Sequence, residues 1–127
     1  MIEKLPPEFI EPIIDSLPVE ISFIDKDDIV RYYSKDGYRI FPRTPDVIGR
    51  KVQQCHPPKS LEKVQTILDG FRAGTRDKAE FWIQLGEKKV LIRYFAVKDK
   101  AGKYLGCLEV SQDITEIQNL EGEKRLL

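Results

Sequence analysis

The stretch that decides the fold is residues 79–115, AEFWIQLGEKKVLIRYFAVKDKAGKYLGCLEVSQDIT. It contains three runs rich in β-branched and aromatic residues, AEFWIQL, KVLIRYFAVKD and YLGCLEVSQDIT. Gly86-Glu87 and Ala101-Gly102 separate the runs and provide short turns. Short turns join neighbouring strands in antiparallel fashion, so the stretch predicts three consecutive antiparallel strands.

Two further strands are predicted upstream. In VEISFID, residues 19–25, apolar and polar residues alternate, and IVRYYS, residues 29–34, is a second β-branched and aromatic run. The polar DKDD segment lies between them as a turn. This pattern predicts a β-hairpin.

Helices are expected between the hairpin and the three strands. Thr44 and Pro45 form a helix-start signal, and Gly49 ends that short helix. A longer helix is predicted over residues 57–74, where prolines open the segment and Gly74 closes it. Its apolar residues recur at three- and four-residue spacing: Leu61, Val64, Ile67, Leu68 and Phe71.

The chain divides into three parts. Residues 1–17 form a short N-terminal helical segment, residues 18–115 form the domain, and residues 116–127 form a tail that could extend as a helix. Ile117, Leu120 and Leu127 would lie on one seam of that helix. Five strands with helices on one side predict an α+β domain.

Length and composition exclude several classes of protein. A chain of 127 residues with 41% hydrophobic content fits one compact domain with its own core. Twenty-one basic residues balance twenty-one acidic ones, so no strong positive field is available to bind nucleic acid or an anionic membrane surface. We therefore expect neither nucleic acid nor a membrane as a partner.

The cysteine positions and the apolar runs indicate a cytoplasmic protein. No signal peptide is apparent, and the apolar runs are too short and too interrupted to span a bilayer. Cys55 precedes a predicted helix and Cys107 lies in a predicted strand. We expect both thiols to be reduced and the protein to be soluble.

The order of these elements resembles that of PAS sensor domains from about Ser16 to Thr115. The resemblance is carried by FIDKDDIVRYYS, TPDVIGRKV and YFAVKDKAGKYLGCLEVSQDIT. More narrowly, RIFPR, GRKVQQCHPPKS and RYFAVKDKAGKYLG resemble the C-terminal PAS domain of a prokaryotic family in which a hemerythrin-like region often precedes it. The chain itself contains no hemerythrin-like set of histidines and carboxylates.

The resemblance implies a five-stranded antiparallel sheet in the order 2-1-5-4-3, with helices packed on one face. It also implies a pocket between sheet and helices that holds haem, flavin, a metabolite or only side chains. The residues expected to line this cofactor-binding pocket are His56, Ile21, Phe23, Val52, Val64, Leu68, Phe71, Ile92, Tyr94 and Leu108. The segment after Gly49 departs from the motif of flavin photoreceptors, which argues against a photochemical flavin.

The stretch QQCHPPKS, residues 53–60, holds the only histidine in the chain. His56 is interpreted as a helix-start residue or, alternatively, as a ligand contact. If the domain binds haem, His56 would be the axial metal ligand and Cys55 the second choice. Their adjacency disfavours a catalytic dyad, and two cysteines and one histidine are too few for a structural zinc site.

Two functions remain open, and neither is enzymatic, because no catalytic motif is found. The first is a sensory module that binds a small ligand and relays its presence through dimer or tail contacts, or to a partner domain in a longer chain. The second is a ligand-free dimerisation module. We expect a homodimer that covers the outer sheet face with Phe9, Ile10, Ile13 and Ile14. The basic cluster of Arg43, Arg50 and Lys51 is interpreted as a solvated loop.

Overall fold

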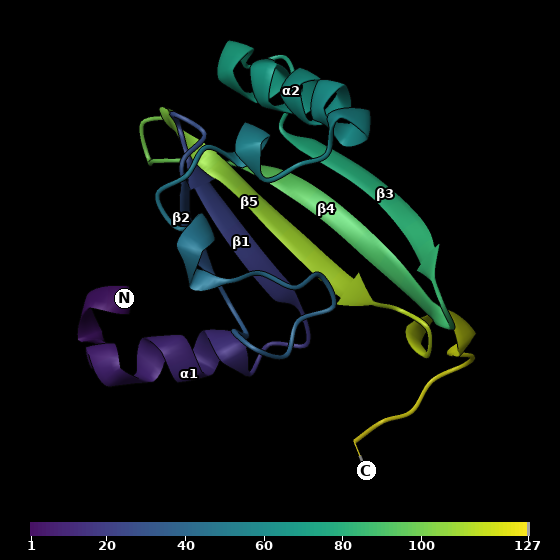
Figure 1. The fold of residues 1–127 in the computed structure, drawn as a ribbon. Helices are drawn as coiled ribbons and strands as arrows, with labels where there is room; N and C mark the ends of the chain where they lie inside the picture. The colour runs from purple at the N-terminus through teal and green to yellow at the C-terminus, as the bar shows by residue number, and fades with distance from the viewer. Residues whose placement is uncertain (127) are drawn as a thin grey trace.

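A computed structural model describes residues 1–126 and consists of one antiparallel sheet, two α-helices and short 3₁₀ turns (Figure 1). The strands are β1 (Glu20–Asp25), β2 (Val30–Tyr33), β3 (Lys78–Leu85), β4 (Lys88–Lys98) and β5 (Tyr104–Asp113). The α-helices are α1 (Ile10–Asp15) and α2 (Pro58–Ala73). The 3₁₀ turns are Ile2–Lys4, Pro7–Phe9, Pro45–Val47, Val52–Gln54 and Ile117–Asn119.

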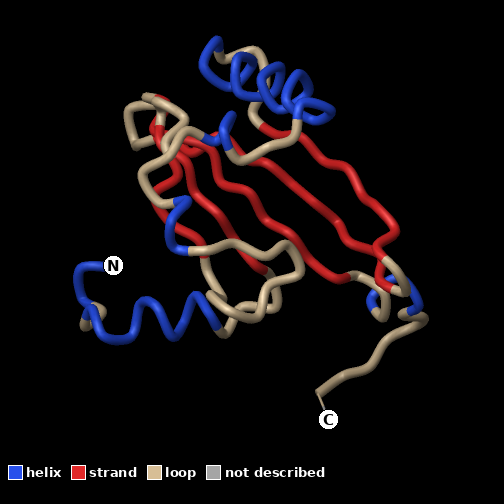
Figure 2. The backbone as a smooth tube through the Cα atoms, viewed as in Figure 1, coloured by secondary structure: helices blue, strands red, loops and turns tan. Residues whose placement is uncertain are grey.

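The five strands form a single sheet in the order β2-β1-β5-β4-β3. Every neighbouring pair is antiparallel, and β4 with β5 forms the longest pairing. Figure 2 shows the strands side by side in one sheet. The predicted α+β class, the five strands and their 2-1-5-4-3 order are therefore confirmed.

Helix α2 lies across one face of the sheet near the end of the β1–β2 hairpin (Figure 1). Val64, Ile67, Leu68 and Phe71 are its buried side chains, as their spacing predicts. The helix ends at Gly74, which adopts the left-handed conformation with φ +74°. We call the face beneath α2 the inner face and the opposite one the outer face.

The side of β1 that faces inward is the opposite of the side expected from the sequence. Glu20, Ser22 and Ile24 are buried on the inner face, whereas Ile21 and Phe23 alternate with them on the outer face. Strand β5 follows the same alternation, because Leu108 pairs with Phe23.

A buried ion pair explains why the polar residue Glu20 of β1 faces inward. The guanidinium Nη2 of Arg39 lies 3.3 Å from Glu20 Oε2, and both side chains are only 3% exposed. Arg39 also donates from Nη1 to the backbone carbonyls of Ser34, at 2.6 Å, and Ile21, at 3.1 Å. Burial lowers the pKa of Arg39, while the Glu20 carboxylate opposes that shift. The pair fixes the 34–43 segment over the inner face.

A second polar contact holds α2 to the turn between β1 and β2. Arg72 forms an ion pair with Asp28, which is buried in that turn. Gln53 donates to the other carboxylate oxygen of Asp28 at 2.7 Å. These contacts attach the C-terminal half of α2 to the turn between β1 and β2. The N-terminal half of α2 borders the groove described in the next section.

The two ends of the chain are only lightly attached. Helix α1 accommodates Pro12 in its first turn, and the backbone amide of Lys35 donates to Asp15 Oδ1 at 3.0 Å. The tail does not extend as an α-helix within residues 116–126, which form only the Ile117–Asn119 turn, and Leu127 lies outside the described residues. Within residues 1–126, no helix is both long and apolar enough to cross a bilayer.

Candidate functional site

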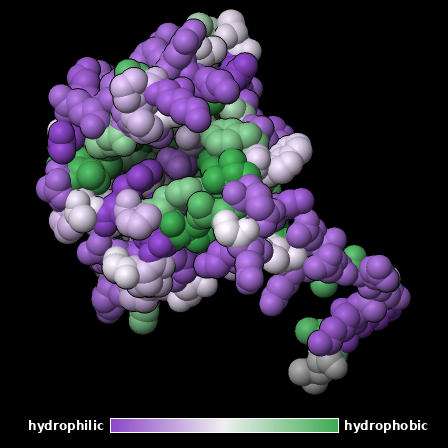
Figure 3. Space-filling view, turned by 45° about the vertical axis from the view of Figure 1, so that its right-hand side comes forward, coloured by the Kyte–Doolittle hydropathy of each residue, from purple (hydrophilic) through white to green (hydrophobic). Residues whose placement is uncertain are grey.

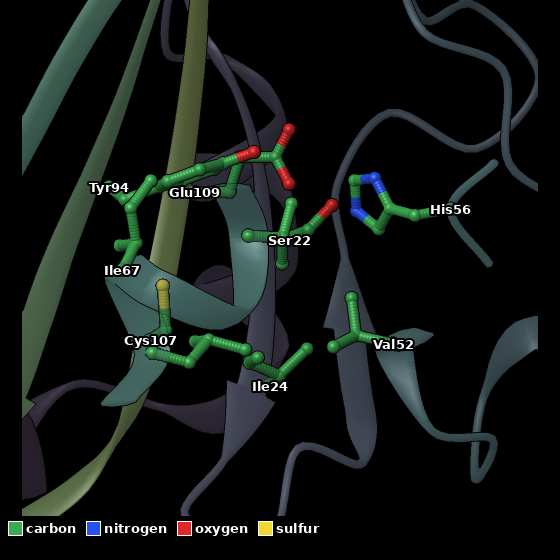
Figure 4. A pocket seen from close by; sticks show the side chains of 10 residues that line it. Ser22, Ile24, Val52, His56, Ile67, Tyr94, Cys107 and Glu109 are labelled. Carbon is green, nitrogen blue, oxygen red and sulfur yellow. The ribbon is translucent and has the colours of Figure 1, made fainter. Parts of the chain in front are cut away.

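A small chamber lies between α2 and the inner face, and Figure 4 shows side chains from strands, loop and helix pointing into it. Its volume is about 20 Å³, which is room for about one water molecule. The lining residues are Ser22, Ile24, Val52, His56, Val64, Ile67, Leu68, Tyr94, Cys107 and Glu109. The chamber is therefore almost filled by the protein's own side chains.

A larger groove borders this chamber and runs between the N-terminal half of α2, the 41–57 segment and strands β3 and β4. Its volume is about 640 Å³. Figure 3 shows apolar side chains bordering a hollow beneath the helix, with hydrophilic ones inside it. The apolar part of the lining comprises Phe41, Pro57, Val64, Ile67, Phe81, Trp82, Ile83 and Ile92. Among the lining polar groups are Arg43, Cys55, His56, Ser60, Lys63, Tyr94 and Glu109.

A row of polar side chains crosses the sheet at the boundary of chamber and groove. Glu109 on β5 pairs with Ser22 on β1 and with Tyr94 on β4, so all three share the inner face. Burial raises the pKa of Glu109, and the nearby guanidinium of Arg43 opposes the shift only in part. The carboxyl group is thus held in a setting that favours its neutral form.

Arg43 belongs to this site rather than to a solvated loop, which corrects the interpretation from sequence. Its side chain is 22% exposed, and its Nη2 lies 3.5 Å from Glu109 Oε2. The buried Arg39 positions it, because Arg39 holds the preceding backbone by donating to the Phe41 carbonyl at 3.0 Å. Arg50, from the same predicted cluster, remains exposed beside Asp46.

His56 lies at the start of α2 and also faces the chamber. It immediately precedes the prolines that begin α2, and its Nδ1 lies 3.4 Å from Ser60 Oγ in the first turn. Its ring also points into the chamber opposite Glu109 and Ser22 (Figure 4). Burial and the charge of Arg43 lower the pKa of His56, so the ring is neutral at neutral pH.

The inner chamber does not fit a haem. A porphyrin is far larger than the 20 Å³ chamber that the His56 ring faces. Cys55, the second choice of ligand, directs its Sγ to the Lys51 carbonyl at 3.6 Å. Among residues 1–126, no three His, Cys, Asp or Glu side chains gather to hold a metal ion.

Six of the residues expected in the pocket line the chamber or the groove: His56, Val52, Val64, Leu68, Ile92 and Tyr94. Phe71 lies in the core beneath α2 with 1% exposure and lines neither space. Ile21, Phe23 and Leu108 differ from the expectation, because strand alternation turns them to the outer face.

Sequence reasoning missed Glu109 and Arg43 as site residues. A signal for Glu109 was present, because it is the one charged residue in the run LGCLEV, residues 105–110. A carboxylate inside a central strand needs a partner or a function. No comparable signal marked Arg43, since its position depends on the Arg39 contacts.

Comparison with known proteins identifies relatives of this chain. The family described as a PAS domain matches residues 10–115. The crystal structure of a C-terminal domain from Streptococcus mutans is 42% identical and superposes with a TM-score of 0.86, covering 92% of this chain and 91% of that one. No curated protein matches.

More distant solved structures share the fold. The PAS domain of BvgS from Bordetella pertussis is 22% identical with a TM-score of 0.63, covering 86% of each chain. A sensory box sensor histidine kinase from Vibrio cholerae is 10% identical with a TM-score of 0.59, covering 85% of this chain and 90% of that one. These two similarities concern the arrangement of the backbone.

Proposed function

Because this chain belongs to the PAS family, we propose that it is a non-catalytic sensory module that binds a small molecule in the groove beside α2. Its own side chains nearly fill the inner chamber, so the ligand occupies the outer groove, with its polar end at Glu109, Arg43 and His56.

The observation that carries the proposal is the composition of the groove. Apolar walls surround a small set of converging polar groups, which is the usual make-up of a small-molecule site. The volume of about 640 Å³ lies within the range of roughly 300–1,000 Å³ typical of such sites.

Strand β5 provides a route from this site to the rest of the chain. Glu109 faces the groove, and four residues after it the strand leads into the tail. The start of the tail is tied to β4, because Ile114 donates to the Lys89 carbonyl at 2.8 Å and Lys89 donates to Thr115 Oγ1 at 3.0 Å. A ligand that displaces Glu109 therefore shifts the end of β5, where β4, β5 and the tail are joined by these hydrogen bonds.

Native mass spectrometry of freshly purified protein tests the proposal. We expect the native mass to exceed the denatured mass by one bound small molecule. Ser60→Trp places an indole in the groove and should abolish the added mass. Glu62→Trp, on the same helix but outside the groove lining, is the matched control and should retain it. Equal native and denatured masses in all three proteins would count against the groove as a binding site.

A second candidate function is a ligand-free dimerisation module, and the side chains of the N-terminal segment favour it. Phe9 and Ile13 are each 50% exposed, and Leu17 is 43% exposed. Apolar side chains gathered in one short segment are typical of a protein contact. In this alternative the nearly filled chamber is simply part of the core, and the groove stays empty.

A further inference from the structure

We propose that the ligand of this groove is an apolar monocarboxylate whose carboxylate binds Arg43 and whose hydrocarbon or ring portion lies against the walls formed by α2, β3 and β4. The inference rests on the proposed function and adds the chemical class of the ligand.

Arg43 has unused hydrogen-bonding capacity. A guanidinium group has five N–H donors. Arg39, four residues earlier, uses its own in contacts with Glu20, Ser22, Ser34, Ile21 and Phe41. Arg43 makes one hydrogen bond within residues 1–126, a long one of 3.5 Å to Glu109. The guanidinium that lines the groove therefore retains donors for a planar anion, which arginine binds in a two-pronged geometry.

The side chains that line the groove carry more positive than negative charge. Two cationic side chains, Arg43 and Lys63, line it, against the single carboxyl group of Glu109. Lys63 lies on α2 and is exposed, so it can reach an anion held at the groove mouth. An anionic ligand is attracted by this arrangement, whereas a cationic ligand would meet two like charges.

The carboxyl group of Glu109 fits the same ligand. Burial raises its pKa, and in its neutral form it is a hydrogen-bond donor to an incoming carboxylate instead of a competitor for Arg43. Tyr94 on β4 pairs with Glu109 on β5, and its hydroxyl is a further hydrogen-bond donor in the groove lining. With Glu109 protonated, Arg43, Glu109 and Tyr94 each present a donor at the polar end of the groove.

The walls require the remainder of the ligand to be apolar. Phe81 and Tyr94 pack edge to face with ring centroids 5.6 Å apart and form one wall. Phe41, Val64 and Ile67 line the groove as well. Burying a hydrocarbon or aromatic body against these side chains supplies most of the affinity, and Arg43 supplies the selectivity for an anion.

Isothermal titration calorimetry with three eight-carbon probes tests the inference: octanoate, 1-octanol and octylamine, all below micelle-forming concentrations. Octanoate should bind at least 10-fold more tightly than 1-octanol. Arg43→Ala should weaken octanoate binding roughly 10-fold or more, since a hydrogen-bonded charge is lost, and leave 1-octanol binding unchanged. Arg43→Lys should restore part of the affinity. Arg50→Ala, an exposed arginine outside the groove, should bind octanoate like the wild type.

The outcomes separate this inference from the proposed function. If 1-octanol or octylamine binds as tightly as octanoate and Ser60→Trp blocks the binding, the groove binds ligands but the assignment of an anion is overturned. If octanoate binds equally well to Arg43→Ala, the role of Arg43 is overturned. If none of the three probes binds and native mass spectrometry detects no ligand, both proposals fail together.

Discussion

At the scale of single residues, the ion pair between Glu20 and Arg39 holds the segment that carries part of the site. Glu20 accepts hydrogen bonds from the backbone amides of Ile40 and Phe41 as well as pairing with Arg39. It therefore fixes the segment that carries Arg43. Removing one partner of a buried pair leaves an uncompensated charge, which costs more than the net contribution of the pair.

We accordingly expect Glu20→Ala to lower the free energy of unfolding by about 3–5 kcal/mol. The comparison is Arg31→Ala, which breaks the Arg31–Asp25 surface pair, where the arginine side chain is 56% exposed. That change should cost less than about 1 kcal/mol. Urea denaturation of both variants measures the difference, and equal losses would contradict the assignment of a structural role to the buried pair.

Glu109 should make stability depend on pH. Its pKa in the folded protein is raised above the ordinary 4.5, so its contribution to stability is fully present below that value and is lost as pH rises through the folded pKa. Arg43, Arg39, Glu20 and His56 surround it and titrate or carry charge as well. Comparison with a single variant isolates Glu109 from these neighbours.

In urea titrations from acidic to mildly alkaline pH, Glu109→Gln should lose this part of the pH dependence. The free energy of unfolding of the wild type should fall relative to that of the variant as pH increases. A difference between the two proteins that stays constant over the whole range would show that the Glu109 carboxyl titrates normally.

At the scale of elements, β5 lies so close to β1 that position 106 has no room for a side chain. A Cβ added at Gly106 would overlap the carbonyl oxygen of Ile24 and the ring of Phe23. Gly74, at the end of α2, is glycine for a different reason, because its φ is +74° while the space around it is open.

The two glycines should therefore respond differently to alanine. Gly74→Ala should cost about 1–2 kcal/mol, the strain of a left-handed residue. Gly106→Ala should cost about 3 kcal/mol or more, since the backbone of two strands must separate. Thermal unfolding gives both values, and a smaller loss for Gly106→Ala would show that the strands adjust easily.

The elements themselves were predictable from sequence, but the side of the sheet that each strand turns inward was not. Periodicity located α2 and the strands, because a 3.6-residue or two-residue repeat is a local property. In β1 the apolar Ile21 and Phe23 suggested the inner face, yet Glu20 and Ser22 occupy it. Their polar groups are satisfied by Arg39, which lies 19 residues from Glu20, and a local pattern does not contain such a partner.

At the scale of the whole molecule, the homodimer stays a prediction that the N-terminal segment can test. We expect the wild type to sediment as a dimer at micromolar concentrations and the double variant Phe9→Asp, Ile13→Asp to sediment as a monomer. Leu120→Asp, a change at a 79% exposed residue in the tail, is the control and should remain dimeric. A monomeric wild type would remove the dimerisation module as an alternative function.

Strand β3 is one of the two edge strands of the sheet, and it carries the only tryptophan in the chain. Trp82 is 66% exposed, and because it pairs with Leu91, between the inward pairs of Phe81 and Ile83, its side chain lies on the outer face. The protein therefore contains a built-in optical reporter: its emission should be red-shifted and open to quenching by acrylamide. Association of two copies through the outer face should bury Trp82 and shift that emission to the blue, whereas a ligand in the groove on the inner face should leave it nearly unchanged. One fluorescence spectrum can thus distinguish the two functions considered above without any added label.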